Sequence, residues 1–420
     1  MKKLALHWKI LIGMALGVVF GVFFSFIPQG SEFIKDYIKP FGTIFINLLK
    51  LIAVPLILAS LIKGVSDLKD ISKLSQMGGR TIITYLITTL TAVTIGLVLV
   101  NIIQPGKSIT EQTRNELVEA YSTDTQEKQA AAAKQKEAGP LNALVEVVPP
   151  NIFAAASNNR NMLQVIFFAL LFGIGMILLP PKKTKPVKKF FDSFNSIILK
   201  LIDLIMLAAP YGVFALLAAL VVEAPSLELF QALALYAVTL LLGLAAMIVV
   251  YLIIVRVFTN KKIDFFMKGI APAQLLAFST SSSAATLPVT LECVEKNLGV
   301  DEEVASFVLP IGATINMDGT SVYQGVAAVF IAQAFGLDLS LSAQLGIVFT
   351  ATLASIGTAA VPSAGIVMLV IVLAQAGIPE AGLALIFAID RPLDMCRTIV
   401  NVTGDAAVSM IVGKSIGKLK

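Results

Sequence analysis

The sequence predicts an all-α integral membrane protein, and three observations indicate this class. Of the 420 residues, 57% are hydrophobic and only 14% are charged, with a mean hydropathy of +0.86. A soluble domain averages about 25% charged residues. Apolar runs of about 20 residues recur along the chain, and such runs are long enough to cross a bilayer as helices. Near the end, an apolar segment over residues 383–412 carries a stripe of charged side chains.

Six apolar runs precede residue 260, and each predicts a membrane-spanning helix. Met1 is followed by two lysines and a long apolar run without a small-residue cleavage site, so we expect a retained first helix rather than a signal peptide. Pro40 and Pro55 are expected to interrupt the second run. The runs cover about 7–27, 37–65, 81–103, 162–179, 190–222 and 230–258.

Residues 107–145 separate the third and fourth runs and are rich in Glu, Lys, Gln and Ala. This composition predicts a polar external loop with no membrane role of its own.

Basic residues concentrate in alternate loops, which indicates the orientation of the chain. Lysine and arginine gather before the first run, between the second and third, between the fourth and fifth, and after the sixth. We therefore expect a multi-pass protein of the cytoplasmic (inner) membrane. By the positive-inside rule, both of its termini should lie on the cytoplasmic side. The net charge of +5 therefore reflects topology, and we expect no nucleic-acid partner.

After residue 260, small polar segments break the apolar runs at residues 278–288, 312–320 and 354–365. Irregular backbone at membrane depth is tolerated only where protein or a water-filled cavity covers it. The first and third breaks resemble each other, which is typical of inverted repeats that meet at a binding site. We interpret them as re-entrant hairpins on either side of a broken seventh helix, about Val304 to Phe335. The alternative is two Ser/Gly-rich loops in the lumen of a channel.

The final apolar helix carries Asp390, Asp394, Arg397, Asn401 and Asp405. At about 100° per residue, all five fall within roughly 80° of one another. Such groups are costly in a membrane and usually mark a pathway for ions or substrates. The alternative is a purely structural network in which Asp394 pairs with Arg397.

The broken segments supply oxygen and hydrogen-bond donors. Asn316 and Asp318 with freed carbonyls suit a dehydrated Na⁺, and Asn401 and Asp405 are placed to complete the cage. Arg397 suits a carboxylate and Asp394 an ammonium group, which together favour aspartate or glutamate. The alternatives are a simple helix kink and close packing of small residues. The sequence has one histidine, and neither cysteine belongs to a CxxC pair, so no prosthetic group is expected.

Four motifs, at residues 281–288, 316–320, 355–358 and 394–405, resemble the glutamate transporter family, the dicarboxylate/amino acid:cation symporters. The resemblance implies eight transmembrane helices, two re-entrant helical hairpins, a homotrimer and elevator-type alternating access. It implies scaffold helices one and two in 1–75, transport-domain helix three in 76–106, the external loop in 107–145, scaffold helices four and five in 146–225, and the remaining transport domain in 226–420.

The resemblance also implies the site residues. Arg397 would take the side-chain carboxylate of the substrate and Asp394 its amino group. The remaining substrate-binding positions would be Ser281, Ser282, Ser283, Thr320, Val361, Pro362, Ser363, Ala364, Gly365, Thr398 and Asn401. Sodium would be held by Tyr85, Thr88, Thr89, Gly312, Thr314, Asn316, Met317, Asp318, Ser355, Ile356, Thr358, Asn401 and Asp405.

This sequence departs from the family pattern at several positions. Many relatives carry a second arginine where Ser281 or Met395 stands here, and Arg391 is a candidate for that role. Gln324 stands where animal members have a glutamate linked to proton and potassium coupling, so no potassium counter-transport is expected.

The resulting hypothesis is Na⁺-coupled import of aspartate or glutamate. A proton-coupled glutamate or C4-dicarboxylate symporter and a ligand-gated anion channel stay open as alternatives. An enzyme is disfavoured because the sequence offers no nucleophile–base pair or metal cluster.

Overall fold

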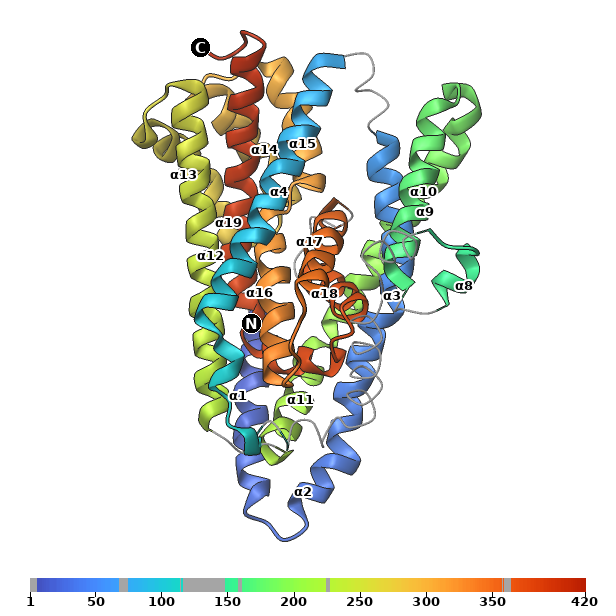
Figure 1. Cartoon of the computed structure of the whole chain (residues 1–420), viewed down its shortest axis with the longest axis vertical. Helices are drawn as coiled ribbons and strands as arrows, with labels where there is room; N and C mark the ends of the chain where they lie inside the picture. The colour runs from blue at the N-terminus through green and yellow to red at the C-terminus, as the bar shows by residue number, and fades with distance from the viewer. Residues whose placement is uncertain are drawn as a thin grey trace, which may run out of the picture.

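The computed structural model describes residues 6–67, 75–113, 115, 148–157, 161–223, 227–356, 358 and 364–420. Nearly all of these residues are helical (Figure 1). Within these ranges the only β-type pairing is an isolated bridge between Val300 and Leu419. The predicted all-α class is therefore confirmed for the described part of the chain.

The N-terminal helices follow the predicted runs closely. They are α1 (Leu6–Ser25), α2 (Gly30–Phe33), the π-helix η1 (Ile34–Ile38), α3 (Lys39–Asp67), α4 (Ser75–Ile103) and the 3₁₀ turn η3 (Pro105–Ser108). The prediction that Pro55 interrupts the second run is wrong, since α3 continues through it, whereas at Pro40 the chain changes from the π-helix η1 to α3. Pro40 cannot donate a backbone hydrogen bond, and it lies one residue into α3. Pro55 removes a single backbone hydrogen bond, and neighbouring helices can support the helix there.

The middle of the chain holds α8 (Ile152–Ala156), α9 (Met162–Leu178), α10 (Pro181–Leu207), α11 (Ala209–Glu223) and α12 (Leu227–Thr259). The predicted fifth run forms two helices, α10 and α11, and begins earlier than expected, at Pro181. The break falls at Ala208, because Pro210 in the first turn of α11 cannot donate a hydrogen bond to a continuous helix. Most of the predicted polar loop, 107–145, lies outside the described residues.

The C-terminal half contains the predicted breaks. Its elements are α13 (Ile263–Thr280), α14 (Ser283–Glu292), η5 (Cys293–Asn297), α15 (Glu302–Ile315), α16 (Asp318–Ala334), α17 (Leu341–Ile356), α18 (Ala364–Gln375), η6 (Glu380–Gly382) and α19 (Leu383–Ser415). Two residues, Ser281 and Ser282, separate α13 from α14. Asn316 and Met317 separate α15 from α16, so the seventh apolar run is broken as predicted.

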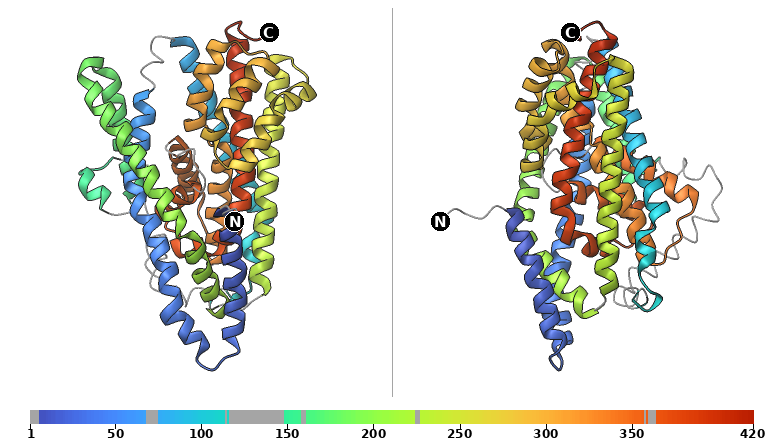
Figure 2. Two further views of the ribbon diagram at one scale, coloured as in Figure 1. Left: turned by 180° about the vertical axis from the view of Figure 1, so that it is seen from behind. Right: turned by 90° about the vertical axis from the view of Figure 1, so that its left-hand side faces the viewer.

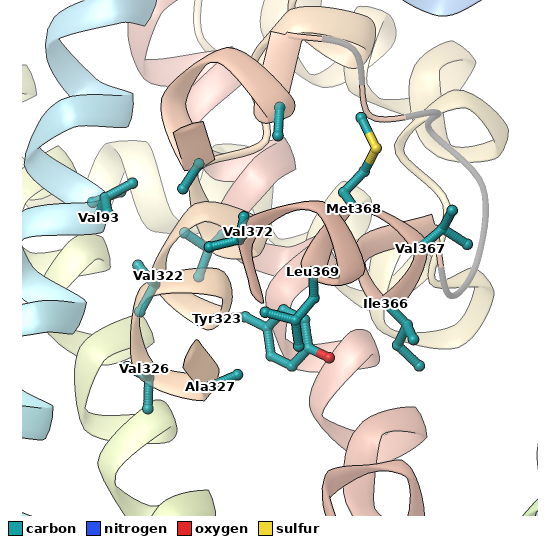
Figure 3. Packing of buried hydrophobic residues seen from close by; sticks show 14 of the residues in the cluster. Val93, Val322, Tyr323, Val326, Ala327, Ile366, Val367, Met368, Leu369 and Val372 are labelled. Carbon is teal, nitrogen blue, oxygen red and sulfur yellow. The ribbon is translucent and has the colours of Figure 1, made fainter. Parts of the chain in front are cut away.

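Helix α16 is the centre of the bundle, and every residue of this helix is buried. It packs against α4, α12 and α19, while α3, α9 and α10 form an arm that projects to one side (Figures 1 and 2). Figure 3 shows α18 lying across α16, with Leu369 and Val372 of α18 near Val322 and Tyr323 of α16. Because most residues of α16 are apolar or small, neighbouring helices can cover it on all sides.

Three of the described helices are long and apolar enough to cross a membrane by length and composition: Met77–Ser108, Glu228–Thr259 and Ile389–Ser415. Shorter apolar helices, such as Ile12–Ser25 and Ala209–Ala219, accompany them. The count of eight spanning helices, and the placement of the hairpins in the membrane, stay predictions.

Candidate functional site

The stripe predicted on the last helix is buried inside the bundle. Asp390, Asp394, Arg397, Asn401 and Asp405 of α19 are each no more than 7% exposed. The side chains of the stripe divide into two polar clusters. One surrounds Arg397, and the other surrounds Asp405 and the break between α15 and α16.

Arg397 is fully buried and lies between two carboxylates. Its Nη2 donates to Asp394 Oδ1 at 2.8 Å, and its Nη1 lies 2.9 Å from Asp390 Oδ1. Arg397 and Asp390 are close enough to form an ion pair, but the two groups are not aligned for a hydrogen bond. Nε and Nη1 of Arg397 therefore still lack a hydrogen-bond partner. The guanidinium carbon lies 3.8 Å from the centroid of the Tyr323 ring, a cation–π contact. Arg397 is thus held in place with two donors available for a carboxylate.

The start of α18 reaches this guanidinium. A methyl group added at Gly365 would lie 3.0 Å from Thr320 Cγ2 and 3.8 Å from Arg397 Cζ. Ala364 and Thr398 are also buried, and the Thr398 hydroxyl donates to the Asp394 carbonyl at 2.8 Å. The N-terminus of α18 therefore contributes backbone beside Arg397. Val361, Pro362 and Ser363, predicted for the same pocket, lie outside the described residues.

The first hairpin turns at the predicted serines. Ser281 has a φ of 52°, a left-handed conformation that directs the chain from α13 into α14. Ser282 caps α14, with its hydroxyl accepting from the Ala285 N–H at 3.2 Å. Ser281, Ser282 and Ser283 are buried, and the Ser281 hydroxyl has no hydrogen-bond partner. The tip thus holds an unused polar group, although no direct contact with Arg397 is seen.

The second cluster gathers around Asp318, at the first residue of α16. Thr89 donates to Asp318 Oδ1 at 2.6 Å, and Tyr251 donates to Asp318 Oδ2 at 2.5 Å. The neighbouring residues of α4 are also buried: the Thr88 hydroxyl donates to the Tyr85 carbonyl, and the Tyr85 hydroxyl to the Val308 carbonyl. Two helices that are distant in sequence, α4 and α12, therefore hold the carboxylate at the start of α16.

Asn316 connects this cluster to α19. Its Nδ2 donates to Asp405 Oδ1 at 2.9 Å, whereas its buried Oδ1 has no hydrogen-bond partner. Gly312 is required here, because a methyl group at this position would overlap the Tyr85 hydroxyl and the Asp405 carboxylate. The arrangement brings an orphaned amide oxygen and two carboxylates into one buried region.

The chemistry of this region suits a hard monovalent cation. In the described part of the chain, neither Asp318 nor Asp405 forms an ion pair with a lysine or arginine. Within the same part, no group of three or more His, Cys, Asp or Glu side chains could hold a metal ion. Carboxylate, amide, hydroxyl and carbonyl oxygens are the ligands that hard cations prefer. This set of oxygen ligands therefore fits a hard cation such as Na⁺.

Asn401 and Gly319 tie the two clusters together. Asn401 Oδ1 accepts from the Gly319 N–H at 2.8 Å, and Asn401 Nδ2 lies 3.3 Å from Met317 Sδ. A methyl group at Gly319 would overlap the Arg397 carbonyl, so glycine permits the close approach of α16 to α19. The broken helix is thereby fixed against α19 between Arg397 and Asp405.

Four of the predicted sodium ligands, Thr314, Ser355, Ile356 and Thr358, lie near the C-terminal ends of α15 and α17. Thr314 is exposed, and its hydroxyl donates to the Ile311 carbonyl of its own helix at 2.9 Å. Ser355 and Thr358 are buried, but their hydroxyls donate to the carbonyls of Thr352 and Ala354. Ile356 ends α17, and its side chain lies outside the described part. Because a donating hydroxyl keeps lone pairs on its oxygen, both the hydroxyls and the backbone carbonyls of these residues stay predicted sodium ligands.

Sequence reasoning missed three members of the clusters. The sequence places Asp390 on the stripe, but its pairing with Arg397 was not predicted. The two residues are seven positions apart, which is two helical turns, so the same face of the helix was the available signal. Tyr251 and Tyr323 lie in apolar helices with no local pattern that distinguishes them. Their roles depend on which helices pack together.

Buried charged and oxygen-rich clusters, placed where helices break inside an apolar bundle, define this chain as a membrane transport protein. The family model of the sodium:dicarboxylate symporter family matches residues 6–415. The chain belongs to that family, and the predicted resemblance is confirmed.

Curated relatives support the same assignment over nearly the whole chain. The proton/sodium-glutamate symport protein of Geobacillus stearothermophilus is 35% identical over 419 residues, covering 100% of this chain and 96% of the relative. The proton/glutamate-aspartate symporter of Escherichia coli is 33% identical, covering 98% and 93%. The excitatory amino acid transporter 3 of Oryctolagus cuniculus is 37% identical, covering 97% and 85%.

Proposed function

We propose that this protein is a secondary active symporter that imports L-aspartate or L-glutamate together with Na⁺. In this proposal Arg397 binds the side-chain carboxylate of the substrate and Asp394 binds its ammonium group. The hairpin tips, including Ser281–Ser283 and Ala364–Gly365, receive the remaining carboxylate. Asn316, Asp318 and Asp405, with Thr89 and Tyr251 as supporting donors, form the cation region.

The observation that carries the proposal is the connection between the two clusters. Asn401 and Gly319 link the cation region to the backbone of Arg397 through one hydrogen bond of 2.8 Å and one close backbone contact. A cation that orders the break between α15 and α16 would therefore also order the surroundings of Arg397. Such a shared element is the physical requirement for coupling, because each ligand then changes the affinity for the other.

The printed names of the relatives agree with an acidic amino acid as the substrate. The Escherichia coli relative is named for glutamate and aspartate, and the Geobacillus stearothermophilus relative for glutamate with protons or sodium. Inward movement of one Na⁺ down a potential of about 100 mV supplies roughly 2.3 kcal/mol before its concentration gradient is counted. That energy is sufficient for concentrative uptake when several ions accompany one substrate.

For the movement itself we propose elevator-type alternating access in a homotrimer of the cytoplasmic membrane, with both termini inside. Residues 1–75 and 146–225 would form the scaffold. Residues 76–106 and 226–420 would move as the transport domain. The tight grouping of α4, α12, α16 and α19, beside the projecting arm of α3, α9 and α10, supports this division.

The test is uptake of labelled L-aspartate by proteoliposomes. An inward Na⁺ gradient is applied in one set, and an inward proton gradient in Na⁺-free buffer in the other. We expect uptake above the passive level only with Na⁺. Uptake driven by protons alone would overturn sodium coupling, and ion currents without accumulation would overturn symport.

Proton coupling is the second candidate function. The observation in its favour is that Asp318 and Asp405 are buried without a basic partner among the described residues, so a proton could neutralise either carboxylate in place of Na⁺. The Escherichia coli relative is named a proton symporter. The proton-gradient set of the same experiment distinguishes the two candidates.

A further inference from the structure

Asp394 is held by two arginines, one on each oxygen of its carboxylate. Arg397 Nη2 donates to Oδ1 at 2.8 Å, and Arg391 Nη1 donates to Oδ2 at 3.2 Å. The Arg391 and Asp394 side chains are only 13% and 9% exposed. Because water has little access to this pair, solvent screens it less than a surface salt bridge.

The two arginines differ in their surroundings. Arg397 is fully buried, with Asp390 and the Tyr323 ring as further contacts. Arg391 precedes Asp394 by three residues on α19 and lies at the edge of the cluster, partly exposed. Arg397 therefore belongs to the centre of the site, whereas Arg391 approaches Asp394 from outside.

We propose that Arg391 is a specificity-determining residue that sets how strongly the site prefers an amino acid over a plain dicarboxylate. This inference rests on the proposed function, in which Asp394 receives the substrate ammonium. Arg391 occupies Oδ2 and offsets the negative charge of Asp394. The ammonium group of a substrate must compete with Arg391 for that oxygen. A ligand without an ammonium group is repelled less by Asp394 than it would be if Arg391 were absent.

L-Aspartate and succinate make a sharp pair of probes. They share two carboxylates and a four-carbon chain, and they differ at the amino group. The ratio of their affinities therefore reports the environment of the ammonium group, while effects common to both ligands cancel. Loss of the Arg391 charge leaves the negative charge of Asp394 less compensated. The ammonium group of aspartate is then bound more strongly, so aspartate gains affinity relative to succinate.

The experiment measures competition for labelled L-aspartate binding to the full-length protein at saturating Na⁺, with unlabelled L-aspartate or succinate as competitor. The variants are Arg391→Gln, which removes the charge, and Arg391→Lys, which keeps it. Arg256→Ala is the control, because Arg256 is exposed and donates to the Asn260 carbonyl far along the sequence from this cluster. The same variants are made in an Asp394→Asn background.

We expect Arg391→Gln to raise the preference for aspartate over succinate by at least about fivefold. Arg391→Lys and Arg256→Ala should keep the ratio within about twofold of the original protein. In the Asp394→Asn background, Arg391→Gln should leave the ratio unchanged, since coupled residues give non-additive effects.

An unchanged or lowered ratio in Arg391→Gln would overturn the inference, as would an equal rise in the Asp394→Asn background. These outcomes are distinct from failure of the proposed function. If the unmodified protein binds no labelled aspartate with Na⁺ or with protons, the substrate assignment falls. If it binds aspartate and the ratio does not respond to Arg391, only the role of Arg391 falls.

Discussion

Asn316 and Asp405 are joined by a buried hydrogen bond, in which Asn316 Nδ2 donates to Asp405 Oδ1 at 2.9 Å. The two residues are 89 positions apart, one at the break after α15 and the other in the middle of α19. The oxygen of the Asn316 side-chain amide, Oδ1, has no hydrogen-bond partner. A broken helix and a continuous helix thus present oxygen atoms to the same buried space.

Replacing Asp405 by Asn should weaken sodium binding more than substrate binding. The change removes one buried negative charge while keeping the shape of the side chain. We expect the Na⁺ concentration for half-maximal aspartate binding to rise by at least about tenfold, with nearly normal aspartate affinity at saturating Na⁺. Sodium titrations of aspartate binding measure both quantities.

Ser409→Ala is the matched control for Asp405→Asn. Ser409 is buried one turn further along α19, and its hydroxyl donates to the Asp405 carbonyl, not to the carboxylate. Its sodium titration should match that of the original protein. Superimposable titrations for Asp405→Asn and the original protein would remove Asp405 from the cation region.

Replacing Arg397 by Ala should abolish selectivity for acidic substrates. Truncating one partner of a buried, hydrogen-bonded charge pair in a complex costs roughly 2–5 kcal/mol of binding energy, so aspartate affinity should fall by at least about 30-fold. Calorimetric titration with aspartate measures the loss, and Arg256→Ala serves as the charge-matched control. Retained aspartate affinity in Arg397→Ala would contradict the assigned role of the guanidinium.

The ring of Tyr323 should contribute to aspartate binding by orienting Arg397. A cation–π contact is worth about 0.5–2 kcal/mol, so Tyr323→Leu should lower aspartate affinity by about 3- to 30-fold. Tyr323→Phe keeps the aromatic face under the guanidinium and should stay within about threefold of the original affinity. Equal losses in the two variants would show that the hydroxyl, rather than the ring, matters.

Replacing Gly319 by Ala should destabilise the fold. The new methyl group would overlap the Arg397 carbonyl, and forcing α16 away from α19 is expected to cost about 1–3 kcal/mol. Thermal unfolding in detergent should show a lowered midpoint. Gly346→Ala, at an exposed helical position with open space around it, should leave the midpoint unchanged or raise it slightly. A normal midpoint for Gly319→Ala would show that the two helices are free to separate.

The amino-acid sequence by itself determined the class of the protein and two of the places where its helices break. Hydropathy, spacing and turn residues are local properties, so they predicted the apolar runs, the breaks at Ser281–Ser282 and Asn316–Met317, and the polar stripe on α19. They also predicted that Asp394 and Arg397 lie on one face, because helical periodicity acts over three or four residues.

Only the tertiary structure decided which distant groups meet. Tyr251 of α12 and Thr89 of α4 hold Asp318, and Tyr323 of α16 lies against the Arg397 guanidinium. No local pattern marks a tyrosine in an apolar helix for such a contact, since the contact depends on how helices pack. The partition of the stripe into a charged cluster around Arg397 and an oxygen-rich region around Asp405 follows from the same packing, because Gly319 and Gly312 let neighbouring groups approach α19 closely.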